Sequence, residues 1–505
     1  RYHKRSGGHG VPLGFETMRS EEVTIAEVLK SAGYATGAFG KWHNGAHYPE
    51  HPCGQGFDTF IGFCGGHWNN YFDTTLEHNG VEFKSEGYIA DAETDYAIRF
   101  IKENAEGPFF CYVPYNPPHG PFQVPDKYFD KYKARGIEDN KLACIYGMVE
   151  CVDDNVRRIL DTLDELEIRE NTIVIFMTDN GPNGARYNAD MIGTKGSLDE
   201  GGSRVPFYIN WPGHIQPGQV IDKIAAHVDV LPTLAELCNV ELGEDHPKLD
   251  GLSLVPLLEG NDEQWPDRLL LCAHPKTTDS ANQGAIRSQR YRAVWIGGKW
   301  RLYDMVEDPS QKTDIAGEHP EMVKQMQETF GQMYADIAAD GFDVVPTQIG
   351  HEGWERVVLP GHEAYLEKIN NKGISYAGGQ GWCNDWISNW TDTEAGAWWP
   401  VKVAAPGTYR VSLLYTCPES DLGSGFSVEI GGKTVGGKID KPHGPITLPS
   451  PDREPRMEVY ERVWATQTLG EIELQPSEGR LTLRATEIPG TKAAEIKGIV
   501  LEKVD

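Results

Sequence analysis

The uncharged run at residues 172–178 constrains the fold of this chain more than any other segment. It reads TIVIFMT, and Asp179, Asn180 and Gly181 follow it directly. An apolar, β-branched segment of this kind is typical of a strand that is buried on both faces in a parallel sheet. Asn-Gly pairs are common turn formers, so these three residues alone favour a simple turn. The run itself predicts an open α/β sheet with an acid and an amide at a strand end, where such sheets place their ligands.

Helical and strand patterns alternate along residues 1–255, which supports this fold class. Apolar residues with helical spacing occur at 23–32, 91–104, 142–166 and 230–237, and further strand patterns occur at 34–39, 109–113 and 205–210. Such alternation predicts a mainly parallel sheet flanked by helices. We therefore predict that residues 1–255 form one α/β domain.

The remaining chain divides into two further predicted regions. Residues 256–342 contain a hairpin pattern that turns at Gly297-Gly298 and a helical pattern at about 320–338, which indicate a small antiparallel subdomain with a helix. Residues 343–505 contain many short alternating strands separated by turns, which predict an all-β sandwich. Tryptophans of this last region are able to stack on sugar rings, although the core of the sandwich is the favoured place for most of them.

Two short segments carry side chains suited to chemistry on an anion. Lys41 and His43, in AFGKWHNG, lie on the same side of an extended segment, where a fixed cation beside an imidazole suits anion binding and proton transfer. His119 lies in PYNPPHGPF, whose prolines stiffen the backbone after the strand pattern at 109–113. Lys195 lies in a glycine-rich loop. Each segment taken alone also fits an ordinary surface loop.

Taken in order, these motifs resemble the sulfatase family of the alkaline phosphatase superfamily. The matching pieces are GKWH at 40–43, PPHGPF at 117–122, TDNG at 178–181, GTKGSLDEGGSRVP at 193–206 and DGLSLVPLLEG at 250–260. The resemblance covers about residues 1–335, and residues 55–73 resemble the branch that acts on sulfated sugars. The 343–505 region resembles carbohydrate-binding modules of the jelly-roll type, more in architecture than in motif.

The family resemblance implies hydrolysis of a sulfate ester of a carbohydrate. It implies that Asp179 and Asn180 hold a Ca²⁺ ion, with Mg²⁺ the less favoured metal. It also implies that lysines contact the sulfate oxygens, that one histidine acts on a formylglycine nucleophile, and that a second protonates the leaving oxygen, a task that a lysine is able to share. The implied catalytic residues are Lys41, His43, His119 and Lys195.

A sugar subsite is predicted from the segment GGHWNNYFD, because amides bond sugar hydroxyls and aromatic rings stack on sugar faces. The predicted substrate-binding residues are His47, His67, Trp68, Asn69, Asn70 and Arg204. A purely structural loop is a close alternative for this segment. For Arg204 the favoured alternative is a salt bridge that braces its own loop.

One part of the family pattern is missing from the sequence. The family forms formylglycine from Cys or Ser in a C/S-x-P-S-R segment, and no such segment occurs in the 505 residues. Two aspartate metal ligands near the first strand of the family are missing as well. The resemblance implies that these residues, and a signal for periplasmic or secreted location, lie upstream of Arg1. An authentic amino terminus at Arg1 would instead indicate a non-catalytic relative.

The composition of the chain indicates which classes of binding partner are disfavoured. The net charge of −28 disfavours nucleic acid, which requires basic surface. No apolar run approaches the ~20 residues that span a bilayer. The nine cysteines form no CxxC spacing, and their odd number argues against a complete disulfide framework.

The sequence also allows two alternative functions, a phosphate ester hydrolase of the same superfamily and a non-catalytic glycan-binding protein. The sequence does not determine the oligomeric state.

Overall fold

The computed structural model describes residues 1–8, 16–273 and 284–505, and the chain forms two compact units. Unit 1 comprises residues 1–10, 23–28 and 163–343. Unit 2 comprises residues 11–22, 29–162 and 344–505. Unit 2 therefore combines the first half of the predicted α/β region with the carboxyl-terminal strands.

A five-stranded mixed sheet lies in unit 2. Its strands are β1 (Ala35–Lys41), β2 (Thr59–Phe63), β3 (Thr75–His78), β4 (Val81–Lys84) and β5 (Phe109–Tyr112), in the order β4-β3-β2-β1-β5. Strand β1 pairs in parallel with both β2 and β5, while β3 and β4 are antiparallel. The carboxyl ends of β2, β1 and β5 therefore meet at one edge of the sheet.

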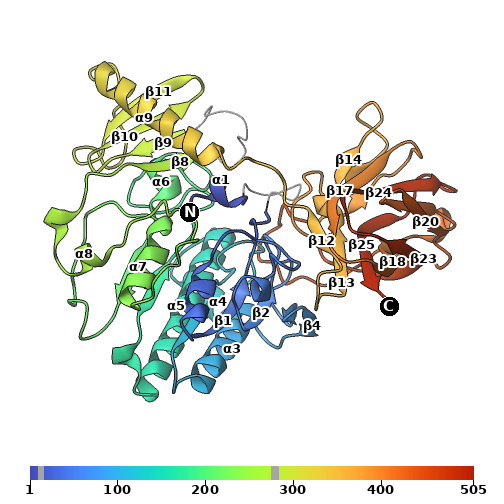
Figure 1. Ribbon diagram of the computed structural model, residues 1–505, viewed down its shortest axis with the longest axis horizontal. Coiled ribbons are helices and arrows are strands. Elements are labelled where there is room, and N and C mark those ends of the chain that lie inside the picture. The colour runs from blue at the N-terminus through green and yellow to red at the C-terminus, as the bar shows by residue number, and fades with distance from the viewer. Residues whose placement is uncertain (9–15, 274–283) are drawn as a thin grey trace. The chain divides into compact units, whose positions relative to one another are not determined.

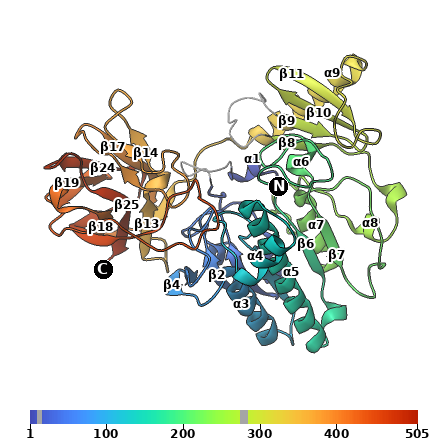
Figure 2. The same cartoon turned by 180° about the vertical axis from the view of Figure 1, so that it is seen from behind.

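Amphipathic helices cover this sheet, as their spacing predicted. Helices α3 (Ile89–Glu103), α4 (Asp126–Ala134) and α5 (Asn140–Glu165) follow β4 and β5 along the chain (Figure 2). The apolar face of α3 places Ala97 and Phe100 against Phe39 and Ile61 of the sheet, and all four side chains are buried. The helices predicted at 91–104 and 142–166 are confirmed to within about two residues at each end.

The carboxyl-terminal part of unit 2 is a β-sandwich, the orange and red strands of Figure 1. One sheet contains β12 (Thr347–Ile349), β14 (Tyr365–Glu367), β17 (Gly396–Val403), β19 (Gly425–Ile430), β20 (Lys433–Lys438) and β24 (Ser477–Glu487). The other contains β13 (Arg356–Pro360), β15 (Ser375–Tyr376), β16 (Ile387–Ser388), β18 (Gly407–Thr416), β23 (Ala465–Leu474) and β25 (Glu495–Lys503). Trp390 and Trp399 are 0% and 1% exposed, so these rings fill the core rather than a surface.

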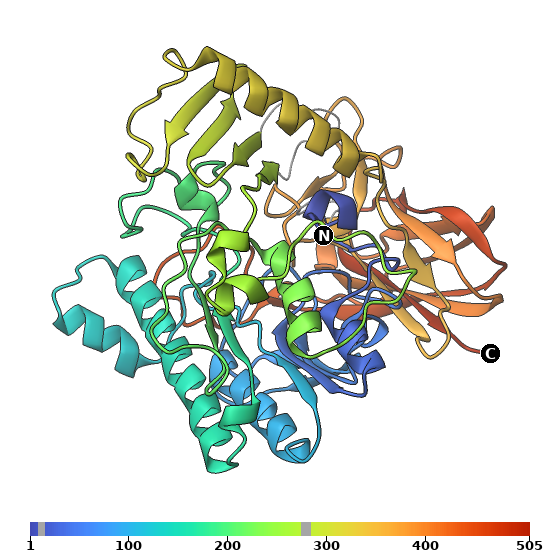
Figure 3. The same cartoon turned by 60° about the vertical axis from the view of Figure 1, so that its left-hand side comes forward.

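The described residues of unit 1 form two antiparallel sheets. The larger has the order β11-β10-β9-β8, with β8 (Leu270–Ala273), β9 (Gly284–Arg287), β10 (Tyr291–Ile296) and β11 (Lys299–Asp304). Helix α9 (Pro320–Ala338) lies along this sheet and buries Phe330 and Ile337 against Trp300 (Figure 3). The predicted turn is confirmed, because Gly297 and Gly298 join β10 to β11 with positive φ angles of 62° and 79°.

The smaller sheet corrects one prediction. Strand β6 (Val174–Met177) pairs antiparallel with β7 (Phe207–Asn210). Phe176 and Met177 are 40% and 37% exposed, so the prediction that residues 172–178 are buried on both faces is wrong for this structure. The physical reason is that, in the described part of the chain, β6 has one neighbouring strand instead of two. The described residues of unit 1 also contain the short helices α1 (His3–Ser6), α6 (Glu200–Ser203), α7 (Val230–Leu237) and α8 (Val255–Leu258).

The predicted class, α/β with a small antiparallel subdomain and a carboxyl-terminal all-β sandwich, is confirmed. The structure also contains helix α2 (Ile25–Ser31) and a two-stranded ladder formed by β21 (Ile446–Thr447) and β22 (Arg462–Val463). A search of the described residues finds no helix with the length and apolarity that a membrane crossing requires.

A buried arginine anchors the glycine-rich loop of unit 1. Arg292 of β10 is 2% exposed, and its Nη1 donates to Glu200 Oε2 at 2.8 Å. Its other nitrogens donate to the carbonyl of Leu198 and to Ser203 Oγ. One guanidinium therefore satisfies acceptors on both sides of α6, and the path of the chain after residue 195 depends on it.

We expect Arg292→Ala to destabilise unit 1 strongly, because it leaves the Glu200 carboxylate buried without its main partner. Breaking a buried ion pair in this way costs about 3–5 kcal/mol. The midpoint of thermal unfolding, followed by near-ultraviolet circular dichroism, measures the effect. Arg290→Ala is the matched control, since Arg290 is exposed and pairs with Asp304 at the surface. Equal shifts in the two variants would contradict the anchoring role.

Candidate active site

Three loops of unit 2 begin at the same sheet edge and are joined by backbone hydrogen bonds. Lys41 is the last residue of β1, and its N–H donates to the carbonyl of Pro114, after β5, at 2.9 Å. The N–H of His43 donates to the carbonyl of Cys64, after β2, at 3.2 Å. Gly40 has a φ angle of 138°, and a Cβ atom there would lie 2.4 Å from the Pro114 oxygen, so only glycine allows this approach.

The loops after β2 and β5 bring two imidazoles together. The rings of His67 and His119 stack with centroids 6.1 Å apart and planes 9° apart. Burial lowers the pKa of His67 to about 3, so this ring is neutral beside His119. The Nδ1 atom of His119 donates to the carbonyl of Gly120 at 2.8 Å, so Nδ1 carries a ring proton.

A fully buried tyrosine fixes the backbone of the His119 loop. Tyr71 is 0% exposed, and its hydroxyl lies 2.9 Å from the carbonyl oxygen of His119 and 2.8 Å from that of Gly120. The same hydroxyl accepts a hydrogen bond from the amide of Asn116 at 2.6 Å. The prolines of this segment predicted a rigid mounting, whereas the position of Tyr71 could not be predicted from the sequence.

The predicted sugar subsite divides into packed and polar members. The ring of Trp68 stacks on Phe63 with centroids 4.8 Å apart, and its Nε1 donates to Thr74, so this residue packs inside unit 2. Asn69 and Asn70 behave differently. Both amide oxygens are buried and have no hydrogen-bond partner within the described chain. Such acceptors suit the hydroxyl groups of a bound sugar.

The sandwich holds the backbone of this subsite. Arg456 donates from Nη1 to the carbonyl of Asn69 at 2.6 Å, and Asn384 donates to the carbonyl of His67 at 3.2 Å. Arg456 is held in turn by a salt bridge to Asp452 at 2.6 Å, with both side chains buried. The carboxyl-terminal sandwich is thus part of the structure that shapes the loop after β2.

His47 is placed differently from the other predicted residues. Its Nε2 atom contacts the carbonyl of Val358 in β13 at 2.7 Å, and its Nδ1 atom accepts from Trp354 at 3.3 Å. Burial lowers the pKa of His47 to about 4. Both ring nitrogens are therefore engaged by the sandwich, which leaves neither of them for a substrate hydroxyl.

His43 has a carboxylate partner that no sequence motif indicated. Its Nε2 atom lies 2.7 Å from Oε2 of Glu16, which is 8% exposed. The two atoms are at ion-pair distance but lack the alignment of a hydrogen bond. A Cβ atom on Gly66 would lie 2.7 Å from the same nitrogen, so glycine at this position leaves room for the imidazole.

The remaining predicted residues lie in unit 1. Asp179 and Asn180 follow β6, and the N–H of Lys195 donates to the carbonyl of Pro182 at 2.9 Å, which joins the lysine loop to the turn after β6. Lys195 is exposed. Arg204 is exposed and lies 3.9 Å from Glu200, the contact that its alternative role as a loop brace requires.

Asp179 and Asn180 fit the donor chemistry of a hard cation. The Oδ1 atom of Asp179 accepts from the N–H of Asn180 at 2.8 Å, and Nδ2 of Asn180 donates to the carbonyl of Gly181 at 2.9 Å. One carboxylate oxygen and one amide oxygen remain for coordination. They are the oxygen donors that Ca²⁺ prefers, although they supply only part of its usual six to eight ligands.

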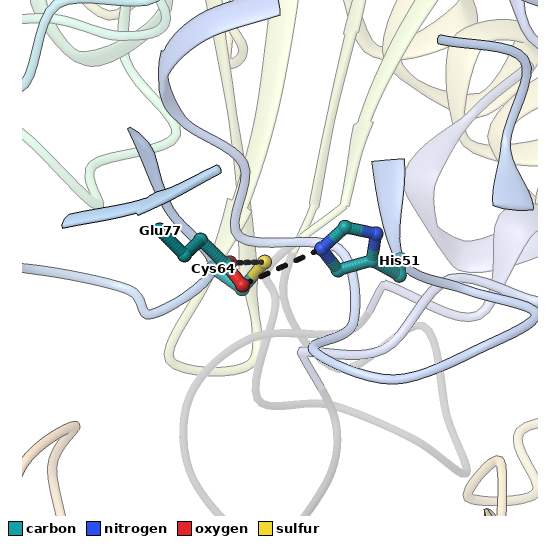
Figure 4. Close-up of side chains that lie close together, drawn as sticks. All are labelled: His51, Cys64 and Glu77. Carbon is teal, nitrogen blue, oxygen red and sulfur yellow. Dashed lines mark hydrogen bonds and ion pairs between the residues drawn. The ribbon is translucent and has the colours of Figure 1, made fainter. Parts of the chain in front are cut away.

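A second polar cluster in unit 2 has a different explanation. Figure 4 shows His51, Cys64 and Glu77, with Cys64 Sγ 3.0 Å and His51 Nε2 3.6 Å from the two carboxylate oxygens. The N–H of Cys53 donates to His51 Nδ1, so the ring proton lies on Nε2 and that nitrogen has no lone pair for a metal. Burial also raises the pKa of Cys64 well above its usual value, so the thiol keeps its proton. We interpret this trio as a structural cluster in which two protonated groups face one carboxylate.

Two protein-family models match most of the chain. A sulfatase family model matches residues 1–240, and a model of the carboxyl-terminal region of N-sulphoglucosamine sulphohydrolase matches residues 194–336. An arylsulfatase of Hemicentrotus pulcherrimus is 30% identical over 370 residues, which cover 65% of this chain and 64% of that protein. The N-acetylgalactosamine-6-sulfatase of Mus musculus is 31% identical over 327 residues, covering 59% of each. The chain thus spans less than two thirds of the length of these two relatives.

Solved structures agree with this placement. The crystal structure of Ps i-CgsB aligns with a TM-score of 0.61 and 29% identity, covering 68% of this chain and 80% of that one. The same protein in complex with k-i-k-neocarrahexaose aligns with a TM-score of 0.61 and 28% identity, covering 68% and 82%. The fold, the ordered motifs and the two family models agree, and this chain belongs to the sulfatase family.

Proposed function

We propose that the protein hydrolyses sulfate esters of a carbohydrate, with a sulfated polysaccharide or its oligosaccharides as substrate. The observation that carries the proposal is the meeting of Lys41, His43 and His119 at the carboxyl edge of β2, β1 and β5. A lysine and two imidazoles at one edge supply a positive charge and proton-transfer groups for an anionic ester. Family membership assigns the anion as sulfate.

The reaction needs two kinds of stabilisation, and the proposal assigns residues to both. Negative charge develops on the sulfuryl oxygens, and Lys41 and Lys195 are proposed to contact them. Charge also develops on the leaving sugar oxygen, and His119 in its imidazolium form is proposed to give this oxygen the Nε2 proton, while its Nδ1–H stays bonded to Gly120. His43 is proposed to act as the base at the nucleophile, with its Nε2 held at Glu16.

Two observations support a carbohydrate substrate. The buried amide oxygens of Asn69 and Asn70 have no partner within the described chain, so they are proposed acceptors for sugar hydroxyls. The structural relative Ps i-CgsB was solved with a neocarrahexaose, and the mouse relative is named for a sulfated sugar. His67 stacks on His119 and is proposed to line the same subsite.

The proposed metal, nucleophile and cellular location follow from the properties of the sulfatase family. We propose that Asp179 and Asn180 bind Ca²⁺, which when bound would neutralise charge on the sulfate oxygens. The nucleophile is proposed to be a formylglycine encoded outside the 505 residues, because these contain no segment that could form one. Since polysaccharides are too large to enter cells freely, the proposed location is periplasmic or secreted.

The first test compares two ester classes. We expect the full-length protein to release sulfate from a panel of sulfated oligosaccharides and to hydrolyse the matching phosphate esters far more slowly. Ion chromatography measures both anions. Faster phosphate release would indicate a phosphate ester hydrolase instead. Glycan binding without sulfate release, in a protein whose intact mass includes formylglycine, would indicate a non-catalytic relative.

The role of His119 predicts a dependence on the leaving group. We expect His119→Ala to lower kcat on a sugar sulfate by about 10²- to 10⁴-fold, because an alkoxide needs its proton. An aryl sulfate with an acidic phenol needs little protonation and should lose much less. Steady-state kinetics on both substrates measure the difference. His443→Ala, a histidine of the sandwich bonded to Val463, is the control. Equal losses on both substrates would contradict the role.

The metal assignment predicts a stability effect as well as an activity effect. We expect Ca²⁺, added after treatment with EGTA, to raise the Tm of the wild-type protein, since an ion that binds only the folded state stabilises it. Asp179→Asn should abolish this gain because it removes the anionic ligand. Asp222→Asn, at an exposed position of unit 1, should keep it. An unchanged gain in Asp179→Asn would contradict the assignment.

A further inference from the structure

Glu16 joins His43 to a histidine of the carboxyl-terminal sandwich. While Glu16 Oε2 lies 2.7 Å from His43 Nε2, Glu16 Oε1 lies 3.4 Å from Nε2 of His362. The side chains of Glu16 and His362 are 7% and 8% exposed. The carboxylate is therefore held between two imidazoles that are far apart in the sequence and away from most solvent.

The core of the sandwich fixes the position of His362. The residue lies in the single turn Gly361–Glu363, directly after β13. Pro360 at the end of β13 pairs with Gly498 of β25, and its carbonyl accepts a hydrogen bond from the buried Trp399 at 2.8 Å. Such a mounting resists movement, because shifting it disrupts both a strand pair and a core tryptophan.

The charges of this cluster are balanced. Burial acts to raise the pKa of Glu16, but contacts with His362 and His43 outweigh it and hold that pKa well below its usual value. Burial acts to lower the pKa of His362, but Cys383, Glu16 and Glu363 together raise it to about 10. Burial and the nearby Glu16 raise the pKa of Glu363. The lowered pKa of Glu16 and the raised pKa of His362 favour a carboxylate beside a protonated imidazole at neutral pH.

The direction of these pKa shifts disfavours a metal ion at the same cluster. Ligand atoms of Glu16, His362 and Glu363 lie within 4.8 Å of one another, a spacing that could hold a cation. A protonated imidazole has no lone pair to coordinate a metal, and a protonated carboxyl is a poor ligand.

We propose that His362 and Glu16 are positioning residues that orient His43 for proton transfer at the nucleophile. The carboxylate faces Nε2 of His43, so the proton lies on that nitrogen and Nδ1 is left as the proton acceptor. In many enzymes a carboxylate orients the histidine that acts as the base. Here Glu16 would orient His43, and His362, from a distant part of the sequence, would in turn hold Glu16. The inference rests on the proposed sulfate ester hydrolysis, in which His43 is the base.

A kinetic double-mutant cycle tests the proposal. The proteins are wild type, Glu16→Gln, His362→Gln and the double variant, in the full-length chain, with a sulfated oligosaccharide as substrate. Each single substitution should lower kcat by about 10- to 100-fold, which is the usual loss when a residue that orients a functional histidine is removed. KM should change by less than about twofold, because neither residue is proposed to contact the substrate. The double variant should be no slower than the slower single variant, because both residues act through one contact. His443→Gln in the same sandwich is the matched control and should keep wild-type kcat.

A pH series of thermal unfolding tests the ion pair without any substrate. The raised pKa of His362 gives stability that is fully present below the unfolded value of about 6.5 and is lost as pH rises toward 10. The lowered pKa of Glu16 gives stability that is present above about 4.5 and is lost below it. The Tm of wild type minus that of the double variant should thus be largest between about pH 4.5 and 6.5 and fall toward pH 10. The other titratable groups near the pair, His43, His67, Lys41, Cys64, Glu363 and Cys383, are the same in both proteins.

The outcomes distinguish failure of the proposed function from failure of the positioning role. If the wild-type protein releases no sulfate from any glycan, the proposed function fails, while the pH series still reports on the pair. If wild type is active and His362→Gln keeps its kcat, the positioning role is wrong. Independent, multiplicative losses in the double variant, or a loss confined to KM, would also overturn it. A Tm difference that does not change between pH 6.5 and 10 would show that His362 and Glu16 are not a charged pair.

Discussion

Parallel pairing of β1 with both β2 and β5 is the constraint on which the rest of unit 2 depends. Parallel strands end at the same edge of a sheet, so segments that follow them meet there whatever their distance in sequence. The register places Lys41 opposite Phe63, and backbone bonds continue beyond the strand ends to Pro114 and Cys64. A lysine, two imidazoles and two unpaired amide oxygens are brought together in this way, without any one loop carrying them all.

The sandwich has a structural role beside any role in glycan binding. Its Arg456 and Asn384 hold the backbone of the loop after β2, and Gln123, from the segment after β5, donates to Asp452 at 2.7 Å. His362 reaches Glu16 and, through it, His43. Buried polar contacts of this kind specify one arrangement, because each unpaired member would be strongly unfavourable. Removing the sandwich would therefore disturb the proposed site.

Sequence patterns predicted the helices and turns, because these elements depend on residues that are close together in the sequence. Helical spacing located α3, α5, α7 and α9, and the Gly297-Gly298 pair located the turn between β10 and β11. The motifs located Lys41, His43 and His119 because each lies at the end of a strand or in the segment that follows one. The partners of these residues could not be predicted in the same way: Glu16 and His362 lie hundreds of positions apart, and no periodicity relates them. The exposure of β6 was missed because an apolar run indicates a preference for burial, whereas the number of neighbouring strands decides it.

The proposed function requires that the polar edge of β2, β1 and β5 binds a sulfate group for hydrolysis. A crystal structure of the His119→Ala variant with an intact sulfated oligosaccharide tests it most directly, because slow turnover keeps the ester in place. We expect the sulfate to lie within hydrogen-bond distance of Lys41 Nζ, and sugar hydroxyls to bond the side chains of Asn69 or Asn70. Sulfate density bound elsewhere in unit 2, with Lys41 and the two asparagines making no contact, would contradict the account.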